Sequence, residues 1–140
     1  MLKNIDPLLN GTLLALLDDM GHGNEIAITD ANFGADAVAE RLVDLPGTSA
    51  SDLLTAILTV FPLDDFVDKP LAVMKAPPET DAMYAEFQAS ADAAEGRAIG
   101  IDVIEPGEFV ARAKLAYAVI SSGERRLYGN IILRKGVLRP

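Results

Sequence analysis

Apolar side chains in this chain recur with two alternating periods, and this alternation limits the fold more than any other feature of the sequence. Amphipathic stripes with helical spacing are separated by short apolar runs that end at glycine, proline or polar residues. Helices are predicted at 11–20, 35–39, 50–61, 81–95 and 106–117, and strands at 25–29, 41–45, 71–75, 98–104, 118–121 and 130–134. Helices that alternate with strands predict an α/β fold, with helices on both faces of one sheet.

The connections between the predicted strands indicate the strand directions. A parallel crossover needs about a dozen residues or more and usually includes a helix. Most consecutive predicted strands are separated by a predicted helix. No helix separates the strands predicted at 118–121 and 130–134, so at least one antiparallel pair is expected there. The expected architecture is a single three-layer α/β/α domain over residues 1–140, with a mostly parallel mixed sheet and an antiparallel C-terminal strand pair.

The composition excludes several classes of function. The chain has no cysteine and one histidine, so it offers neither a disulfide framework nor a histidine-rich metal site. Its net charge of −9 repels the phosphates of nucleic acids. The N-terminus lacks the apolar core of a signal peptide, and no run approaches the ~20 apolar residues that span a bilayer. We therefore expect a cytoplasmic protein without nucleic-acid or membrane partners.

Two candidate site residues flank the strand predicted at 25–29. His22 lies before it, between Gly21 and Gly23, and a histidine side chain can both give and take a proton near neutral pH. Asp30 lies after the strand, and ligands of open α/β sheets collect at the carboxyl ends of strands. Two other interpretations stay open: His22 as an exposed residue beyond a helix end, and Asp30 as an Asx turn or helix cap.

A third candidate, Tyr128-Gly129-Asn130, precedes the last predicted strand. It offers a phenol, a close backbone approach and an amide, although a glycine before a strand is also typical of a turn. Residues 124–126 are predicted to form a solvated loop. The chain has no glycine-rich phosphate loop and no Gly-x-Ser-x-Gly nucleophile motif. The remaining chemistry is acid–base catalysis on, or binding of, a neutral hydroxylated ligand.

Four separated parts of the chain carry a pattern found in one known family. They are Met20–Ile26, Asp30–Phe33, Ser51–Leu54, and the C-terminal part with Gly123-Glu124, Tyr128–Leu133 and Lys135–Val137. In these parts, in their order and in their spacing, the chain resembles the D-ribose pyranase and L-fucose mutarotase family over nearly its whole length.

The resemblance implies an enzyme that interconverts the anomers or ring forms of a free monosaccharide, L-fucose or a related aldose, without metal or organic cofactor. It assigns catalysis to His22, and sugar binding to Asp30, Tyr128, Gly129 and Asn130. Asp30 would fix His22 or a sugar hydroxyl. In the family the Tyr128–Asn130 segment reaches the site of a neighbouring subunit, in a ring-shaped decamer of two pentamers. Gly129 in place of alanine is more similar to the fucose branch.

One position departs from the family pattern. Where the fucose branch has a ligand-binding arginine and the ribose branch a histidine, this chain has Pro106, whose side chain offers neither charge nor donor. An alternative therefore stays open, in which the protein is a non-catalytic monosaccharide-binding or regulatory protein that retains the pocket.

Overall fold

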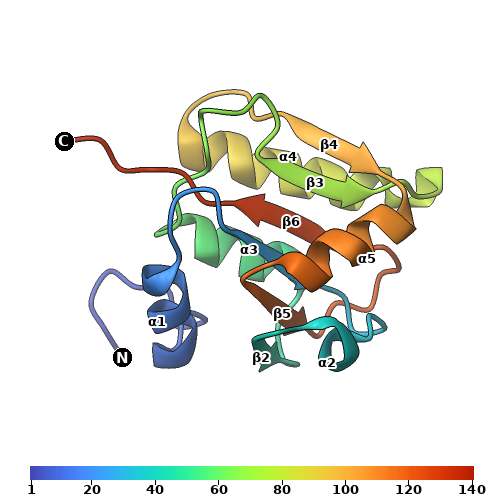
Figure 1. The fold of residues 1–140 in the computed structure, drawn as a ribbon, viewed down its shortest axis with the longest axis horizontal. Helices are drawn as coiled ribbons and strands as arrows, with labels where there is room; N and C mark the ends of the chain where they lie inside the picture. The colour runs from blue at the N-terminus through green and yellow to red at the C-terminus, as the bar shows by residue number, and fades with distance from the viewer.

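The computed structural model describes residues 1–140 and contains five α-helices and six strands (Figure 1). The helices are α1 (Gly11–Asp19), α2 (Ala35–Val38), α3 (Ala50–Leu58), α4 (Asp81–Glu95) and α5 (Pro106–Leu115), and a 3-10 turn η1 (Pro78–Thr80) precedes α4. The strands are β1 (Glu25–Thr29), β2 (Leu42–Leu45), β3 (Leu71–Met74), β4 (Ile101–Ile104), β5 (Ala118–Ser122) and β6 (Ile131–Arg134). None of the helices combines the length and the apolarity that crossing a membrane requires.

The six strands form one sheet in the order β2-β5-β1-β6-β3-β4. β6 is antiparallel to its neighbours β1 and β3, and all the other pairs are parallel. The expected antiparallel strand is thus present, but β5 is not its partner, because β1 lies between β5 and β6. The loop between β5 and β6 is long enough to pass over one intervening strand.

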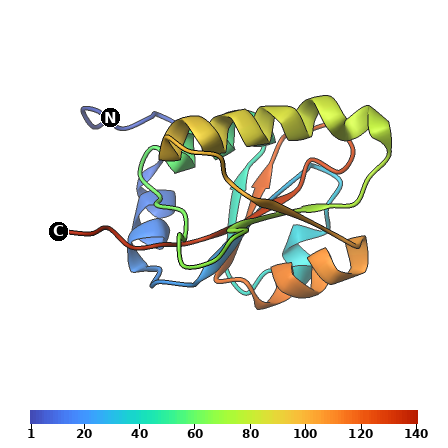
Figure 2. The same cartoon turned by 90° about the horizontal axis from the view of Figure 1, so that it is seen from above.

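Side chains of the central strands alternate between two cores. Ile26 and Ile28 of β1 face the larger core with side chains of α1, α3 and α4, whereas Ala27 faces a smaller core with side chains of α2 and α5. Figure 2 shows α3 and α4 on one side of the sheet and α2 and α5 on the other. The three-layer fold with a mostly parallel sheet confirms the predicted fold class.

The largest difference between a predicted and an observed first residue is in the strand predicted at 98–104, because β4 begins only at Ile101. The backbone N–H of Ile99 donates to the carboxylate of Asp92 at 2.8 Å, and the side-chain amide of Gln88 donates to the Ile99 carbonyl at 2.7 Å. Because these backbone groups bond to α4, they are not available to the sheet.

The strand directions divide the functional residues between two edges of the sheet. Five of the six strands run the same way, so their carboxyl ends meet at one edge, where β6 also begins. We call this the carboxyl edge and the opposite one the amino edge. Figure 1 shows α1 and the C-terminus at one end of the sheet, the amino edge, and the β5–β6 connection at the other.

Candidate functional site

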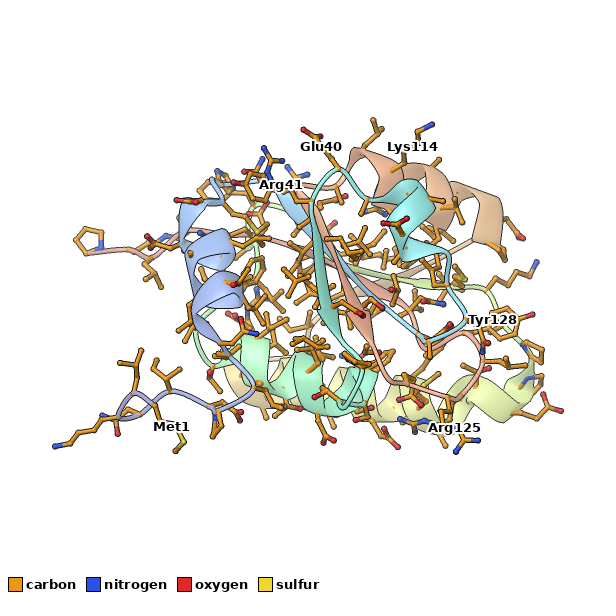
Figure 3. All side chains as sticks on the ribbon, turned by 90° about the horizontal axis from the view of Figure 1, so that it is seen from below. Met1, Glu40, Arg41, Lys114, Arg125 and Tyr128 are labelled. Carbon is orange, nitrogen blue, oxygen red and sulfur yellow. The ribbon has the colours of Figure 1, made fainter.

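A cavity of about 280 Å³ opens at the carboxyl edge, beside the end of β1. We call it the Asp30 cavity. Its lining residues come from the β1–α2 connection, the end of β3 and the β5–β6 connection: Asp30, Asn32, Phe33, Met74, Leu127, Tyr128 and Asn130. Figure 3 shows Tyr128 at the end of the molecule opposite Met1. Three of the sequence-predicted sugar-binding residues therefore line one hollow of a single chain.

The carboxylate of Asp30 is almost fully buried and is held in place by Asn130. The backbone N–H of Asp30 donates to Oδ1 of Asn130 at 2.8 Å, and Nδ2 of Asn130 donates to Oδ2 of Asp30 at 2.9 Å. Oδ1 of Asp30 accepts from the backbone N–H of Asn32 at 2.9 Å, which is the Asx turn that the sequence allowed. The Asx turn leaves further lone pairs on the carboxylate, with which it can accept from a ligand hydroxyl.

Tyr128 occupies a left-handed backbone conformation, with φ of 63°. For a side-chain-bearing residue this conformation costs about 1–2 kcal/mol, so other contacts must hold the turn. Oη of Tyr84 donates to the Met74 carbonyl at 2.7 Å and lies 3.3 Å from the Tyr128 carbonyl, which also accepts from the backbone N–H of Asn130 at 2.7 Å. The Tyr84 phenol thus joins two walls of the cavity. Burial, together with Tyr128 and Asp30 nearby, raises the pKa of Tyr84 to about 12.

Gly129 lies where the turn approaches Glu124 most closely. A Cβ at Gly129 would lie 2.5 Å from Cγ of Glu124 and 3.4 Å from Cβ of Asp30. The prediction of a solvated loop is wrong for Glu124, which is 4% exposed. Its carboxylate accepts from the guanidinium of Arg126 and from the backbone N–H of Ala50 at the start of α3. Hydrogen bonding to Arg126 lowers the pKa of Glu124 despite its burial.

His22 lies at the amino edge, in the connection between α1 and β1, with its side chain 42% exposed. Its Nε2 lies 3.0 Å from Oδ1 of Asp64, and its ring packs on Phe66 with 5.1 Å between the ring centroids. An ionised carboxylate only accepts hydrogen bonds, so this contact places a proton on Nε2 and leaves Nδ1 free to exchange protons. We call these two side chains the His22–Asp64 pair.

The backbone around His22 is fixed by the end of β6. Gly23 has a φ of 82°, and a Cβ there would lie 3.1 Å from Nη2 of Arg134, so both conformation and space favour glycine. Its N–H donates to the Lys135 carbonyl at 2.8 Å. Nζ of Lys135 donates to the Leu17 carbonyl at 2.6 Å, so this lysine binds an otherwise unpaired carbonyl at the end of α1.

Asp64 is the most buried charge at the amino edge, with its side chain 1% exposed. Oδ2 accepts from Nε of Arg134 at 2.8 Å, and Oδ1 also accepts from the backbone N–H of Phe66 at 3.1 Å. Burial alone raises the pKa of Asp64, but hydrogen bonds from Arg134, the Phe66 amide and His22 outweigh it, and the pKa is lowered. The carboxylate therefore stays ionised at neutral pH.

The structure does not bring His22 and Asp30 of one chain together. They lie beyond opposite ends of β1, whose five residues span about 16 Å at ~3.3 Å per residue. The expectation that Asp30 fixes the His22 ring is therefore wrong within a chain, and Asp64 is the ring's partner. Tyr128, Gly129 and Asn130 instead lie beside Asp30 of the same chain, because antiparallel β6 begins at the carboxyl edge next to the end of β1.

Sequence reasoning missed three residues of these two groups. Asp64 and Tyr84 carry no local pattern, since aspartates in a connection and a tyrosine on a helix occur in most proteins. Arg134 ends an apolar run and is indistinguishable from an ordinary strand end. The structure contains no group of three or more histidine, cysteine, aspartate or glutamate side chains that could hold a metal ion.

Comparison with known proteins gives one family. The model of the RbsD / FucU transport protein family matches residues 3–138. The chain is 40% identical over 140 residues to the L-fucose mutarotase of Glaesserella parasuis serovar 5, covering 98% of this chain and 96% of that protein. It is 41% identical over 143 residues to the L-fucose mutarotase of Haemophilus influenzae strain PittGG, covering 98% and 97%.

Solved structures agree with this result. The fucose mutarotase of Streptococcus pneumoniae, in complex with L-fucose, superposes with a TM-score of 0.92 at 34% identity and covers 99% of this chain and 100% of that one. Bacillus subtilis RbsD, complexed with D-ribose, superposes with a TM-score of 0.72 at 27% identity and covers 99% and 100%. The likeness thus extends over whole chains in both cases.

Proposed function

Because the chain belongs to the RbsD / FucU transport protein family, we propose that it is a mutarotase that interconverts the anomers of a free monosaccharide, L-fucose or a related aldose. Two relatives at about 40% identity are L-fucose mutarotases, and the similar Streptococcus pneumoniae structure contains L-fucose. Within this chain, the observation that carries the proposal is the Asp30 cavity. A carboxylate fixed by Asn130 faces a hollow of about 280 Å³, near the lower end of the size range of ligand sites.

The chemistry of anomer exchange matches the groups present. Opening a sugar ring removes a proton from the anomeric hydroxyl and delivers one to the ring oxygen, and closure reverses both transfers. An imidazole can accept and donate in this way, and a positioned acid–base group contributes ~10²- to 10⁴-fold to a rate. His22 presents Nδ1 for these transfers, while Asp30, Tyr128 and Asn130 bind hydroxyls.

The complete site then needs two copies of the chain. His22 and the Asp30 cavity of its own chain lie beyond opposite ends of β1, whose five residues span about 16 Å. Each half of the site also has an exposed apolar neighbour: Phe66, 66% exposed, beside His22, and Leu127, 65% exposed, at the cavity. We place the His22–Asp64 pair of one copy over the Asp30 cavity of the next. Contacts between two different surfaces form a ring where the rotation between neighbouring copies closes, which is compatible with the decamer expected from the resemblance.

The lining of the cavity favours a deoxy sugar. Phe33, Met74 and Leu127 contribute apolar surface beside the polar groups of Asp30 and Asn130. Such a wall covers a methyl group, as in the 6-deoxy sugar L-fucose, better than a hydroxymethyl group, whose hydroxyl would lose its hydrogen bonds to water. Pro106, at the start of α5, adds no donor for a further hydroxyl.

Anomer exchange measured by NMR, with and without the protein, tests this function. We expect the protein to accelerate exchange of L-fucose anomers, and His22→Ala to lose ~10²-fold or more of that acceleration while sugar still raises its melting temperature. Equal exchange rates for parent and variant would exclude His22 as the catalyst. Sugar-dependent stabilisation of the parent without any acceleration would identify the non-catalytic alternative.

A further inference from the structure

Arg134 contacts the His22–Asp64 pair through the carboxylate oxygen of Asp64 that does not face the ring nitrogen. Its Nε donates to Oδ2 of Asp64 at 2.8 Å, while Oδ1 of Asp64 lies 3.0 Å from Nε2 of His22. One buried carboxylate is therefore shared between a permanent cation and a ring that titrates. The Arg134 side chain is 38% exposed, so the guanidinium also reaches solvent.

We propose that Arg134 is a positioning residue of the His22–Asp64 pair: it directs the buried carboxylate at Nε2 and, as the cation next to this carboxylate, sets the pH range over which His22 exchanges protons. Its effect on catalysis rests on the proposed function. Its effect on proton binding by the ring does not, because that follows from the contacts within one chain.

The geometry around Arg134 is fixed on several sides. Its backbone carbonyl accepts from the N–H of Asp64 at 3.0 Å, and its own N–H donates to the Pro70 carbonyl at 2.9 Å. The side chain of Arg134 reaches Asp64. A Cβ at position 23 would lie 3.1 Å from Nη2 of Arg134, so glycine at this position leaves the guanidinium its space. Backbone and side chain of Arg134 thus hold the same aspartate, which fixes the direction of its carboxylate.

Most of the other charged groups at this edge have partners of their own: Arg139 pairs with Asp65, Arg112 with Glu25, Arg41 with Glu40, and Lys135 donates to carbonyls at the end of α1. Asp18 and Asp19, in the last turn of α1, form no ion pair. Arg139 lies over the ring of Phe66, with 5.4 Å from its Cζ to the ring centroid. Arg134 is therefore the one arginine in direct contact with the Asp64 carboxylate.

Removal of this cation has a definite sign. Without Arg134 the full negative charge of Asp64 acts on the ring, and the repulsion between guanidinium and imidazolium disappears. Both changes favour proton uptake by the His22–Asp64 pair, which titrates as a unit. An opposite charge at contact distance shifts a titration by about 1–3 pH units, and the partly exposed guanidinium places the expected shift near the lower end, at about one unit.

An NMR titration of the imidazole in the full-length protein tests the proposal, and since His22 is the only histidine its ring signals need no assignment. We expect Arg134→Met to move the titration midpoint upward by about one pH unit. Arg134→Lys should restore the midpoint toward that of the parent. Arg41→Met, which removes an equal charge from a residue that does not touch Asp64, should leave it unchanged.

An unchanged or lowered midpoint in Arg134→Met, with a melting transition that shows the variant to be folded, would overturn the proposal. So would an equal shift in Arg41→Met. In the catalytic readout, the acid limb of the anomer-exchange rate should move upward with the NMR midpoint. If the midpoint moves but the parent shows no exchange activity, the role of Arg134 in proton binding stands and the proposed function fails.

Discussion

Tyr84 offers the sharpest test of how the carboxyl edge is held together. Replacement by phenylalanine keeps the ring, which stacks on Phe87 with 5.9 Å between centroids, and removes only the hydroxyl that reaches the carbonyls of Met74 and Tyr128. One hydrogen bond contributes about 0.5–1.5 kcal/mol, and a buried carbonyl left without a donor adds to that loss. At pH 8 we expect the free energy of unfolding of Tyr84→Phe to be about 1–2 kcal/mol lower than that of the parent.

The pH dependence gives this expectation a sign. Folding raises the pKa of Tyr84 to about 12, from about 10 in an unfolded chain. The phenol therefore contributes its full stability below about pH 10 and loses it as the pH rises toward 12. This pKa difference of about two units corresponds to at most about 2.7 kcal/mol of folding stability, and access of solvent to the half-buried ring reduces this contribution to about 1–2 kcal/mol.

Urea denaturation of parent and variant at a series of pH values measures both effects. The stability gap between them should be largest near pH 8 and should close between pH 10 and 12. Tyr117→Phe is the control, because its ring lies beneath Arg41 and its phenolic oxygen makes no hydrogen bond in the structure. Equal stability of parent and Tyr84→Phe at pH 8, or a gap that stays constant up to pH 12, would refute the reasoning.

Two further predictions concern the amino edge. A Cβ at Gly136 would lie 2.5 Å from the Leu63 carbonyl oxygen and 2.9 Å from Cα of Asp64, so Gly136→Ala should cost about 1–3 kcal/mol in urea denaturation. Gly107→Ala, with no atom within 4 Å of the new Cβ, should cost less, and equal costs would contradict the packing argument. Because the pKa of Asp64 is lowered on folding, its contribution to stability is present above about pH 4 and is lost as the pH falls below that. The urea midpoint of the parent should thus fall more steeply between about pH 5 and pH 2 than that of Asp64→Asn, and parallel curves would disprove this.

The local features of the fold could be predicted because they depend on neighbouring residues. Asn10 caps α1 and Ser49 caps α3 through their side chains, and Gly96 ends α4 in the left-handed conformation, roles that these residue types favour at helix ends. Proline at 106 begins α5 for the same kind of local reason. Apolar periodicity likewise identified all six strands, with ends that differ by three residues at most.

Strand order and the arrangement of the site could not be predicted in this way. Pairing of β6 with β1 and β3 depends on contacts between residues that are far apart in the sequence, and the length of the β5–β6 loop is compatible with more than one partner. The same limit explains His22, whose partner Asp64 lies 42 residues later in the sequence. His22 and Asp30 are close in the sequence, but the strand between them places them beyond its opposite ends.

A mixing experiment tests the central claim, that each site combines the His22–Asp64 pair of one copy with the Asp30 cavity of another. His22→Ala and Asp30→Asn should each lose most of the anomer exchange when assembled alone. In oligomers assembled from both chains at equal amounts, an intact cavity should meet an intact imidazole in about one quarter of the sites. We predict that the mixed assembly regains about a quarter of the parental exchange rate in NMR. A mixed assembly no more active than the two variants alone would contradict a site shared between copies.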